Sequence, residues 1–166
     1  MADSCFWSTF NNGTCELLSI SRTEINNLTL IANNGGLPTY QMVRADDSSC
    51  IKYYVDGLEY AYARTICKRD GGELLRIDSQ SKQDRMVRIL KTVFYVTVDV
   101  TVQGTKENST GNWLFDDGTL MNYFKWNANQ PSNGPPELYL YLNANDNWKW
   151  NDIGLEKKTF LCEIRA

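Results

Sequence analysis

The sequence predicts an α+β domain in which two helices lie beside antiparallel sheets and a long irregular loop region carries the function. Three observations lead to this prediction. Two segments with helical spacing of apolar residues come first, at 58–69 and from Ser79 onward. Segments rich in β-branched and aromatic residues follow them. The longest stretch without either pattern lies between Gly104 and Pro136, and such long loops are commonly functional.

The N-terminal part differs in composition from the rest of the chain. Cys5 to Leu18 contains two short strand patterns around Asn11-Asn12-Gly13, which is a turn signal of β-hairpins. Residues 32–49 are rich in glycine, proline, aspartate and serine, which predicts a connector or irregular edge. We therefore predict an N-terminal hairpin extension with its connector over residues 1–45 and one folded domain over residues 46–166.

Both predicted helices have recognisable ends. The first covers Leu58 to Arg69 and stops at Gly71-Gly72, where glycine accepts a left-handed cap without steric cost. The second begins at Ser79 or at Ser81, because Ser81 with Asp84 three residues later resembles a capping box. The side chains of this second helix that we expect to face the core are Met86, Val87, Ile89 and Leu90.

Strand patterns dominate after the second helix. Three segments combine β-branched or aromatic residues with turn-forming residues at their ends. Each predicts one strand or more of the sheet. They are VFYVTVDVTVQG at 93–104, ELYLYLN at 137–143 and KKTFLCEI at 157–164.

Composition excludes several classes of function. The chain has 17 basic and 20 acidic residues and no long basic run, so neither nucleic acid nor an anionic membrane is an expected partner. No apolar run is long enough to span a bilayer, which predicts no membrane insertion. The chain has no histidine, which removes serine and cysteine triads and the common zinc-hydrolase sites. We predict a binding protein and not an enzyme.

Cysteines and glycosylation sequons favour an extracellular location. The five cysteines never form a CxxC pair, so a zinc ribbon or a thioredoxin-like motif is not expected. Sequons occur at Asn12, Asn27 and Asn108 in polar surroundings. Together these features predict a secreted glycoprotein with disulfide bonds. The first residues lack the layout of a secretory signal, so we expect a mature region or a fragment of a longer protein.

Four ordered segments from Cys50 onward resemble the C-type lectin-like domain family. The resemblance covers about 50–166 and implies a double-looped fold whose terminal strands meet and whose long loop presents a metal site and a sugar site. Four segments in register are far more specific than one. They are SCIKYY, YAYARTICKRDGGELLRIDS, GNWLFDDGTLMNYFKWNANQPS and NWKWNDIGLEKKTFLCEI.

The resemblance also assigns the cysteines. It implies a disulfide bond between Cys67 and Cys162, which would contribute about 4 kcal/mol by closing a long loop. The family's second bridge would fall on Tyr139 and Leu155, so we expect apolar packing to replace it. Cys50 is expected to pair with Cys5 or Cys15, leaving one thiol that could join two copies.

The segment CFWSTFNNGTCELL, at residues 5–18, carries a second and fainter resemblance. It resembles the end of a PAN or apple module, which would need further cysteines upstream of Met1. The alternative is a simple hairpin laid against the lectin-like domain.

The resemblance places a calcium ion against the loop NANQPSNGPPE at 127–137. The resemblance also implies a cis peptide bond before Pro131. Calcium prefers six to eight oxygen ligands, such as carboxylates and amide carbonyls, and this loop is rich in such groups. Glu137 and Asn151 would bind the ion and the sugar hydroxyls together. The implied metal ligands are Gln130, Ser132, Glu137, Asn151 and Asp152, and the implied sugar-binding residues are Gln130, Glu137, Trp148 and Asn151.

Ser132 departs from the family pattern. The Gln130-Pro131-Ser132 triplet resembles the galactose-type order, which ends in aspartate, so one carboxylate is lost. We therefore expect one weakly bound calcium ion, with a dissociation constant of roughly 10⁻⁴ to 10⁻³ M, or none. Trp148 is the candidate for the aromatic face against the sugar, whereas Trp113, Trp126 and Trp150 are expected in the core.

Two functions follow as hypotheses. The first is a secreted, calcium-dependent protein that binds a glycan or glycoprotein by direct coordination of sugar hydroxyls. The alternative is a calcium-independent module that recognises a protein through the Gly104–Leu120 loop and the long-loop face. The monosaccharide, the oligomeric state and the partner of the odd cysteine stay open.

Overall fold

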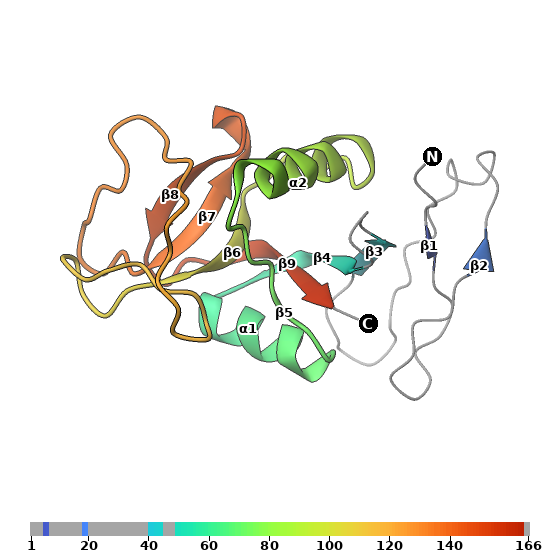
Figure 1. Ribbon diagram of the computed structural model, residues 1–166, viewed down its shortest axis with the longest axis horizontal. Helices are drawn as coiled ribbons and strands as arrows, with labels where there is room; N and C mark the ends of the chain where they lie inside the picture. The colour runs from blue at the N-terminus through green and yellow to red at the C-terminus, as the bar shows by residue number, and fades with distance from the viewer. Residues whose placement is uncertain (1–4, 7–17, 20–39, 45–48, 165–166) are drawn as a thin grey trace.

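The computed structural model describes residues 5–6, 18–19, 40–44 and 49–164, and it has the predicted α+β architecture (Figure 1). Strands β1 (Cys5–Phe6) and β2 (Leu18–Ser19) form an antiparallel pair of their own. This pair agrees with the predicted hairpin strands, while the turn at Asn11-Asn12-Gly13 lies outside the described residues. Most of the segment that resembles a PAN or apple module also lies outside them, so that resemblance stays a prediction.

The main sheet has seven strands in the order β3-β4-β9-β6-β7-β8, with β5 added against β9. All pairs are antiparallel except β6 and β9, which run parallel with Val100 opposite Thr159. The sheet is therefore mixed: most pairs are antiparallel, as predicted, and β6 and β9 are parallel because the chain passes through β7 and β8 between them. The strands are β3 (Tyr40–Arg44), β4 (Cys50–Leu58), β5 (Glu73–Leu74), β6 (Val100–Thr105), β7 (Tyr139–Asn143), β8 (Lys149–Ile153) and β9 (Lys158–Ile164).

Strand β3 lies in the segment 32–49 that composition predicted as a connector or irregular edge. It pairs with β4 from Tyr40 opposite Tyr54 to Arg44 opposite Cys50, and it is an edge strand of the sheet. The division of the chain at residues 45 and 46 stays a prediction. The pairing that we expected between Cys50 and Cys5 or Cys15 stays a prediction, because the side chain of Cys5 and the whole of Cys15 lie outside the described part.

Both predicted helices are present, but the first begins at Tyr60 and not at Leu58, which is the last residue of β4. Helix α1 (Tyr60–Arg69) is followed by Gly71 with φ of 80°, which is the left-handed stop that the sequence indicated. Helix α2 (Gln80–Thr92) is capped by Ser79, whose side chain accepts a hydrogen bond of 3.3 Å from the backbone N–H of Lys82. Of the two expected starting points, Ser79 is therefore the cap. Ser81 lies inside the helix.

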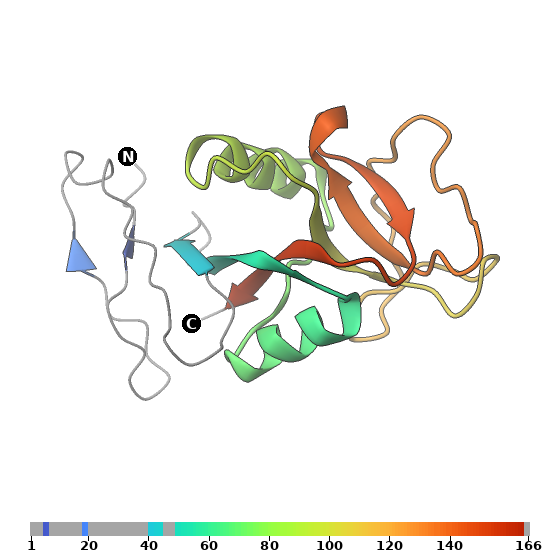
Figure 2. The same cartoon turned by 180° about the vertical axis from the view of Figure 1, so that it is seen from behind.

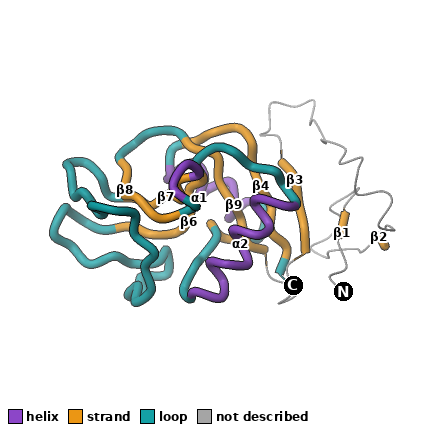
Figure 3. The backbone as a smooth tube through the Cα atoms, turned by 90° about the horizontal axis from the view of Figure 1, so that it is seen from above, coloured by secondary structure: helices purple, strands orange, loops and turns teal. Residues whose placement is uncertain are grey.

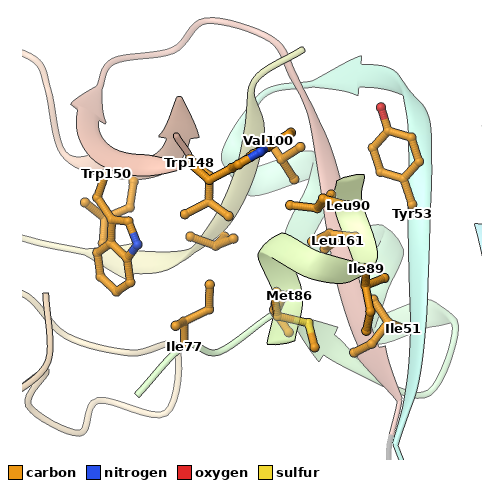
Figure 4. Packing of buried hydrophobic residues seen from close by; sticks show 14 of the residues in the cluster. Ile51, Tyr53, Ile77, Met86, Ile89, Leu90, Val100, Trp148, Trp150 and Leu161 are labelled. Carbon is orange, nitrogen blue, oxygen red and sulfur yellow. The ribbon is translucent and has the colours of Figure 1, made fainter. Parts of the chain in front are cut away.

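The helices cover opposite faces of the sheet, as the two opposite views show (Figure 1 and Figure 2). Successive strand residues point to opposite faces. Thus Leu161 belongs to the core cluster under α2, whereas Cys162 belongs to the cluster under α1. The α2 cluster includes Met86, Ile89 and Leu90 of the helix together with strand residues and the tryptophans (Figure 4). The α1 cluster consists of Tyr54, Tyr60, Ala63, Cys67, Leu74, Phe160 and Cys162.

The disulfide bond between Cys67 and Cys162 is present, as the resemblance implied. It joins α1 to β9 across 95 positions, inside the α1 cluster. At the site of the family's second bridge, Tyr139 stacks on Tyr60 with ring centroids 4.6 Å apart. Leu155 is 61% exposed, so the expectation of apolar packing at that position was wrong. Leu155 lies in the turn between β8 and β9, where solvent reaches it.

The strand predicted over 93–104 begins only at Val100. Residues 93–99 follow α2 as a connection without regular structure, in which Tyr95 has φ of 51°, a left-handed conformation that does not occur in a strand. Strand β8 was not predicted, because its segment was assigned only to the loop site. Between Thr105 and Tyr139 the chain has no strand longer than an isolated bridge, so the long irregular region is where the sequence placed it.

The loops gather at the end of the sheet near β7 and β8 (Figure 3). Because β8 ends the strand order, it is an edge against which the long loop can pack. Within the described residues, no helix has the length and apolar character that crossing a bilayer requires.

Candidate functional site

The loop 127–137 has a defined backbone conformation beside β8. The peptide bonds Gln130–Pro131 and Pro135–Pro136 are both cis, and the first of these is the bond that the resemblance implied. Asn129 and Asn133 adopt left-handed conformations with φ of 60° and 54°, which asparagine tolerates better than most residues. The loop is therefore shaped by proline and asparagine rather than by regular pairing.

Asp152 on β8 fastens this loop to the sheet. Its Oδ1 accepts a hydrogen bond of 2.8 Å from the backbone N–H of Ser132, and its Oδ2 accepts one of 2.9 Å from that of Asn133. The hydroxyl oxygen of Ser132 also lies 3.2 Å from Oδ1, but its single proton can serve only one acceptor at a time, and Oε2 of Glu137 is nearer at 2.5 Å. The Asp152 side chain has no exposed surface. A carboxylate this deeply buried needs such donors because water cannot solvate it.

Lys106, directly after β6, supplies the positive charge at Asp152. Its Nζ lies 3.5 Å from Oδ2 of Asp152 and donates a hydrogen bond of 2.7 Å to Oδ1 of Asn133. The same ammonium lies 4.6 Å from the centroid of the Trp113 ring, within range of a cation–π contact. The Lys106 side chain is also fully buried. The site thus contains a buried ion pair, and sequence reasoning did not find its cationic member.

Glu137 and Gln130 meet at Ser132. Oε2 of Glu137 accepts hydrogen bonds from the Ser132 hydroxyl at 2.5 Å and from the backbone N–H of Gly134 at 2.7 Å. Oε1 of Gln130 accepts from the backbone N–H of Ser132 at 3.1 Å. Four of the predicted site residues, Gln130, Ser132, Glu137 and Asp152, are therefore in one connected network.

Asn151 belongs to a different set of contacts. Its Nδ2 donates a hydrogen bond of 3.0 Å to the hydroxyl of Tyr141, which is its cross-strand partner on β7. Burial, and then the charge of Asp99, raise the pKa of the Tyr141 phenol, so it stays a neutral partner. Oδ1 of Asn151 is buried and makes no hydrogen bond. Because a buried oxygen without a partner is unfavourable, a further hydrogen-bond donor or a cation at this position would stabilise the site.

Trp148, the candidate aromatic face for a sugar, lies in the core. It is 2% exposed and packs in the α2 cluster near Trp150 (Figure 4). Its carbonyl accepts a hydrogen bond of 2.8 Å from Nε2 of Gln83 on α2. In this conformation its indole has no open face for a ligand. Trp113, Trp126 and Trp150, which we expected in the core, do lie in or against it.

The segment 106–120 is held against α1 by charged groups. Asp116 accepts a hydrogen bond of 2.8 Å from the Tyr60 hydroxyl and pairs with Arg64 at 3.1 Å. The hydroxyl of Tyr60 in turn accepts from the backbone N–H of Gly104 at 3.1 Å. Burial, and then the Asp116 charge, raise the pKa of Tyr60 well above its usual range, so the phenol stays protonated as a donor. This end of the loop is anchored independently of Asp152.

The donor set around Asp152 does not fit a calcium ion in this arrangement. Calcium needs six to eight oxygen ligands and excess negative charge. Here both oxygens of Asp152 already accept backbone N–H groups, and the Lys106 ammonium offsets one of the two carboxylate charges. Within the described residues, no group of three or more Cys, Asp or Glu side chains could hold a metal. Among the described residues, the buried and unpartnered Oδ1 of Asn151 is an observation that favours a metal ion.

Comparisons with known proteins agree with the fold. A family model described as the lectin C-type domain matches residues 56–164. The galactose-specific lectin nattectin of Thalassophryne nattereri is 26% identical over 119 residues, which are 69% of this chain and 73% of that protein.

Two solved structures share the architecture. Human lithostathine superposes with a TM-score of 0.67 at 21% identity, covering 74% of this chain and 95% of that one. A calcium-independent type II antifreeze protein superposes with a TM-score of 0.64 at 20% identity, covering 83% and 97%. At these identities the likeness concerns the fold alone.

Proposed function

This chain belongs to the C-type lectin domain family, and from that premise we propose that it is an extracellular binding domain, not an enzyme, that recognises its ligand without bound calcium. The absence of histidine in the sequence supports binding over catalysis. The same fold occurs in an antifreeze protein that is described as calcium-independent. The fold therefore does not determine whether calcium binds, and the proposal depends on the ligand atoms of this chain.

The contact between Lys106 and Asp152 carries the proposal. A calcium ion held by Asp152 would bring a second positive charge against the Lys106 ammonium, whose Nζ is 3.5 Å from the carboxylate. Both side chains are fully buried, so water screens this repulsion poorly. The ammonium and two backbone N–H groups already satisfy the carboxylate. We infer that these protein groups hold the loop 127–137 on β8 and take the place that a metal ion would have.

The ligand surface we propose is the face made by segment 106–120 with the adjoining loop 127–137. Most side chains of 107–110, 117–120 and 132–136 are exposed and polar. Leu120 is an exposed apolar side chain among them, with 51% of its surface accessible. This mixture suits the rim of a protein interface. Asn108, exposed in the same segment, is the sequon that we propose as a glycosylation site.

A second candidate is calcium-dependent carbohydrate binding through Gln130, Ser132, Glu137 and Asn151. The specific observation in its favour is the buried, unpartnered Oδ1 of Asn151, which a metal ion would satisfy. The relative nattectin is named as galactose-specific, which adds support for a glycan ligand. In this version Asp152 would have to exchange its contact with Lys106 for one with calcium.

Calorimetric titration of calcium into the purified chain separates the two candidates. The calcium-independent proposal expects no heat of binding up to millimolar calcium and no change in binding when a chelator is added. A calcium-dependent lectin would instead be retained on immobilised galactose and released by the chelator. In that case Glu137→Gln would abolish retention, while Glu107→Gln, at an exposed glutamate of the same long loop, would not. Saturable calcium binding by the wild type would refute the calcium-independent proposal.

A further inference from the structure

The long-loop site is the network of Gln130, Ser132, Asn133, Glu137 and Asp152. We propose that the ammonium of Lys106 takes the place of a metal cation in this site and prevents calcium from binding there. This inference rests on the proposed function and names the one residue that we hold responsible for excluding calcium. Removing the ammonium would leave the two backbone N–H bonds to Asp152 in place, and it should free the second lone pair of Oδ2, which now faces Lys106, for a calcium ion.

The contacts of Lys106 are those of a cation that organises a loop. Its Nζ contacts Oδ2 of Asp152 on β8 and Oδ1 of Asn133 in the loop, and it lies over the ring of Trp113. Three segments distant in sequence therefore meet at one positive charge. A lysine that only filled space would not need two oxygen partners in a fully buried position.

The atoms that Lys106 touches are hard oxygen donors. The carboxylate of Asp152 and the amide oxygen of Asn133 are ligand types that calcium prefers, and water can supply further ligands in the space that a shorter side chain leaves. A second carboxylate, that of Glu137, joins the same network through the hydroxyl of Ser132. Without Lys106 the network carries two carboxylate charges and no cation among the residues that contact it.

The decisive variant is Lys106→Ala, compared with the wild type by calcium calorimetry and by melting in calcium, in magnesium and with chelator. We expect calcium binding to appear with a dissociation constant of about 10⁻³ M, and magnesium to have little effect because it demands a tighter octahedral geometry. The melting temperature should rise by roughly 5 °C in about tenfold excess of calcium over the dissociation constant. Lys149→Ala, at an exposed lysine of β8, is the control and should show neither calcium binding nor a change of melting temperature in calcium.

The double variant Lys106→Ala with Asp152→Asn distinguishes charge from packing. It removes both charges, so it should show no calcium response and should melt at a higher temperature than Lys106→Ala in chelator. If Lys106→Ala folds only in calcium while the double variant folds without it, the inference is supported. If neither folds, or if Lys106→Ala shows no calcium response, Lys106 does not act as a stand-in cation and the inference fails.

The two proposals fail in different ways. Calcium binding by the wild type overturns the calcium-independent function, whatever Lys106→Ala does. If neither the wild type nor Lys106→Ala binds calcium, the calcium-independent function stands and only the role assigned to Lys106 is overturned.

Discussion

The indole Nε1 of Trp150 donates a hydrogen bond of 2.9 Å to Oε1 of Gln83, although the two residues are 67 positions apart. Nε2 of the same glutamine donates to the carbonyl of Trp148 at 2.8 Å. Gln83 is 2% exposed and Trp150 is fully buried. One side-chain amide of α2 therefore satisfies two polar groups at the start of β8. This contact positions the strand that carries Asn151 and Asp152.

Replacing Gln83 with leucine should destabilise the fold by about 2–6 kcal/mol, because two buried polar groups lose their partners at about 1–3 kcal/mol each. The free energy of unfolding is measured with urea. Gln80→Leu is the control, since Gln80 makes its side-chain hydrogen bonds at the surface and should change stability by no more than about 0.5 kcal/mol. An unchanged urea midpoint for Gln83→Leu would show that these hydrogen bonds contribute nothing.

Removing the disulfide bond by the double change Cys67→Ala and Cys162→Ala should cost about 4 kcal/mol. The bond closes a separation of 95 positions, and the loss is entropic in the chain-closure model. Urea unfolding of the double variant should match that of the reduced wild type. A loss below about 1 kcal/mol would mean that the unfolded chain is restrained by something other than this bond.

Asp70 should contribute to the free energy of unfolding at neutral pH, and this contribution should be lost in acid. Burial raises the pKa of its carboxyl, but hydrogen bonds from Lys52 and Tyr54 outweigh burial and hold that pKa below its usual value. The unfolded chain therefore takes up this proton at a higher pH than the folded protein. The contribution is complete above the unfolded pKa, about 3.9, and is lost as pH falls through the folded pKa.

The check is the free energy of unfolding at neutral pH and at successively lower pH. The wild type should lose stability more steeply below about pH 4 than Asp70→Asn, which has no such proton to take up. Asp146→Asn, at an exposed aspartate that contacts neither Lys52 nor Tyr54, is the control. Parallel slopes for Asp70→Asn and the wild type would contradict the assignment.

Gly72→Ala should destabilise the protein by about 1–3 kcal/mol through overpacking. A Cβ at this position would lie 2.5 Å from the carbonyl oxygen of Glu163 and 2.7 Å from Cγ1 of Ile164, because the chain enters β5 directly against β9. Gly111→Ala is the matched control. There the nearest atom to an added Cβ is at 3.4 Å, so stability should change little or rise slightly. Equal melting temperatures for both variants would refute the close approach.

The elements that local chemistry encodes were predictable. Helices α1 and α2 have strong apolar periodicity and end signals at Ser79 and Gly71, and both formed where expected. Strands β7 and β9 also lie inside their predicted segments. Residues 93–99 have the same β-rich composition but form a loop, because the connection between α2 and β6 has to turn there. Composition alone does not contain that constraint.

The site was predictable in part. The resemblance gathered Gln130, Ser132, Glu137 and Asp152, and the structure does bring these four into one network. It also offered Trp148 as an aromatic face, but that indole is buried beneath α2. Lys106 escaped notice because a single lysine 46 positions from Asp152 has no sequence signal that distinguishes it from a solvated charge.

The sequence by itself determined the family, the two helices and the position of the long loop, because these follow from local patterns and from motifs in a fixed order. Only the tertiary structure decided which charge meets Asp152. That choice depends on the crossing of β6, β8 and the 127–137 loop at one point, where burial makes an unpaired carboxylate costly and Lys106 is the cation within reach.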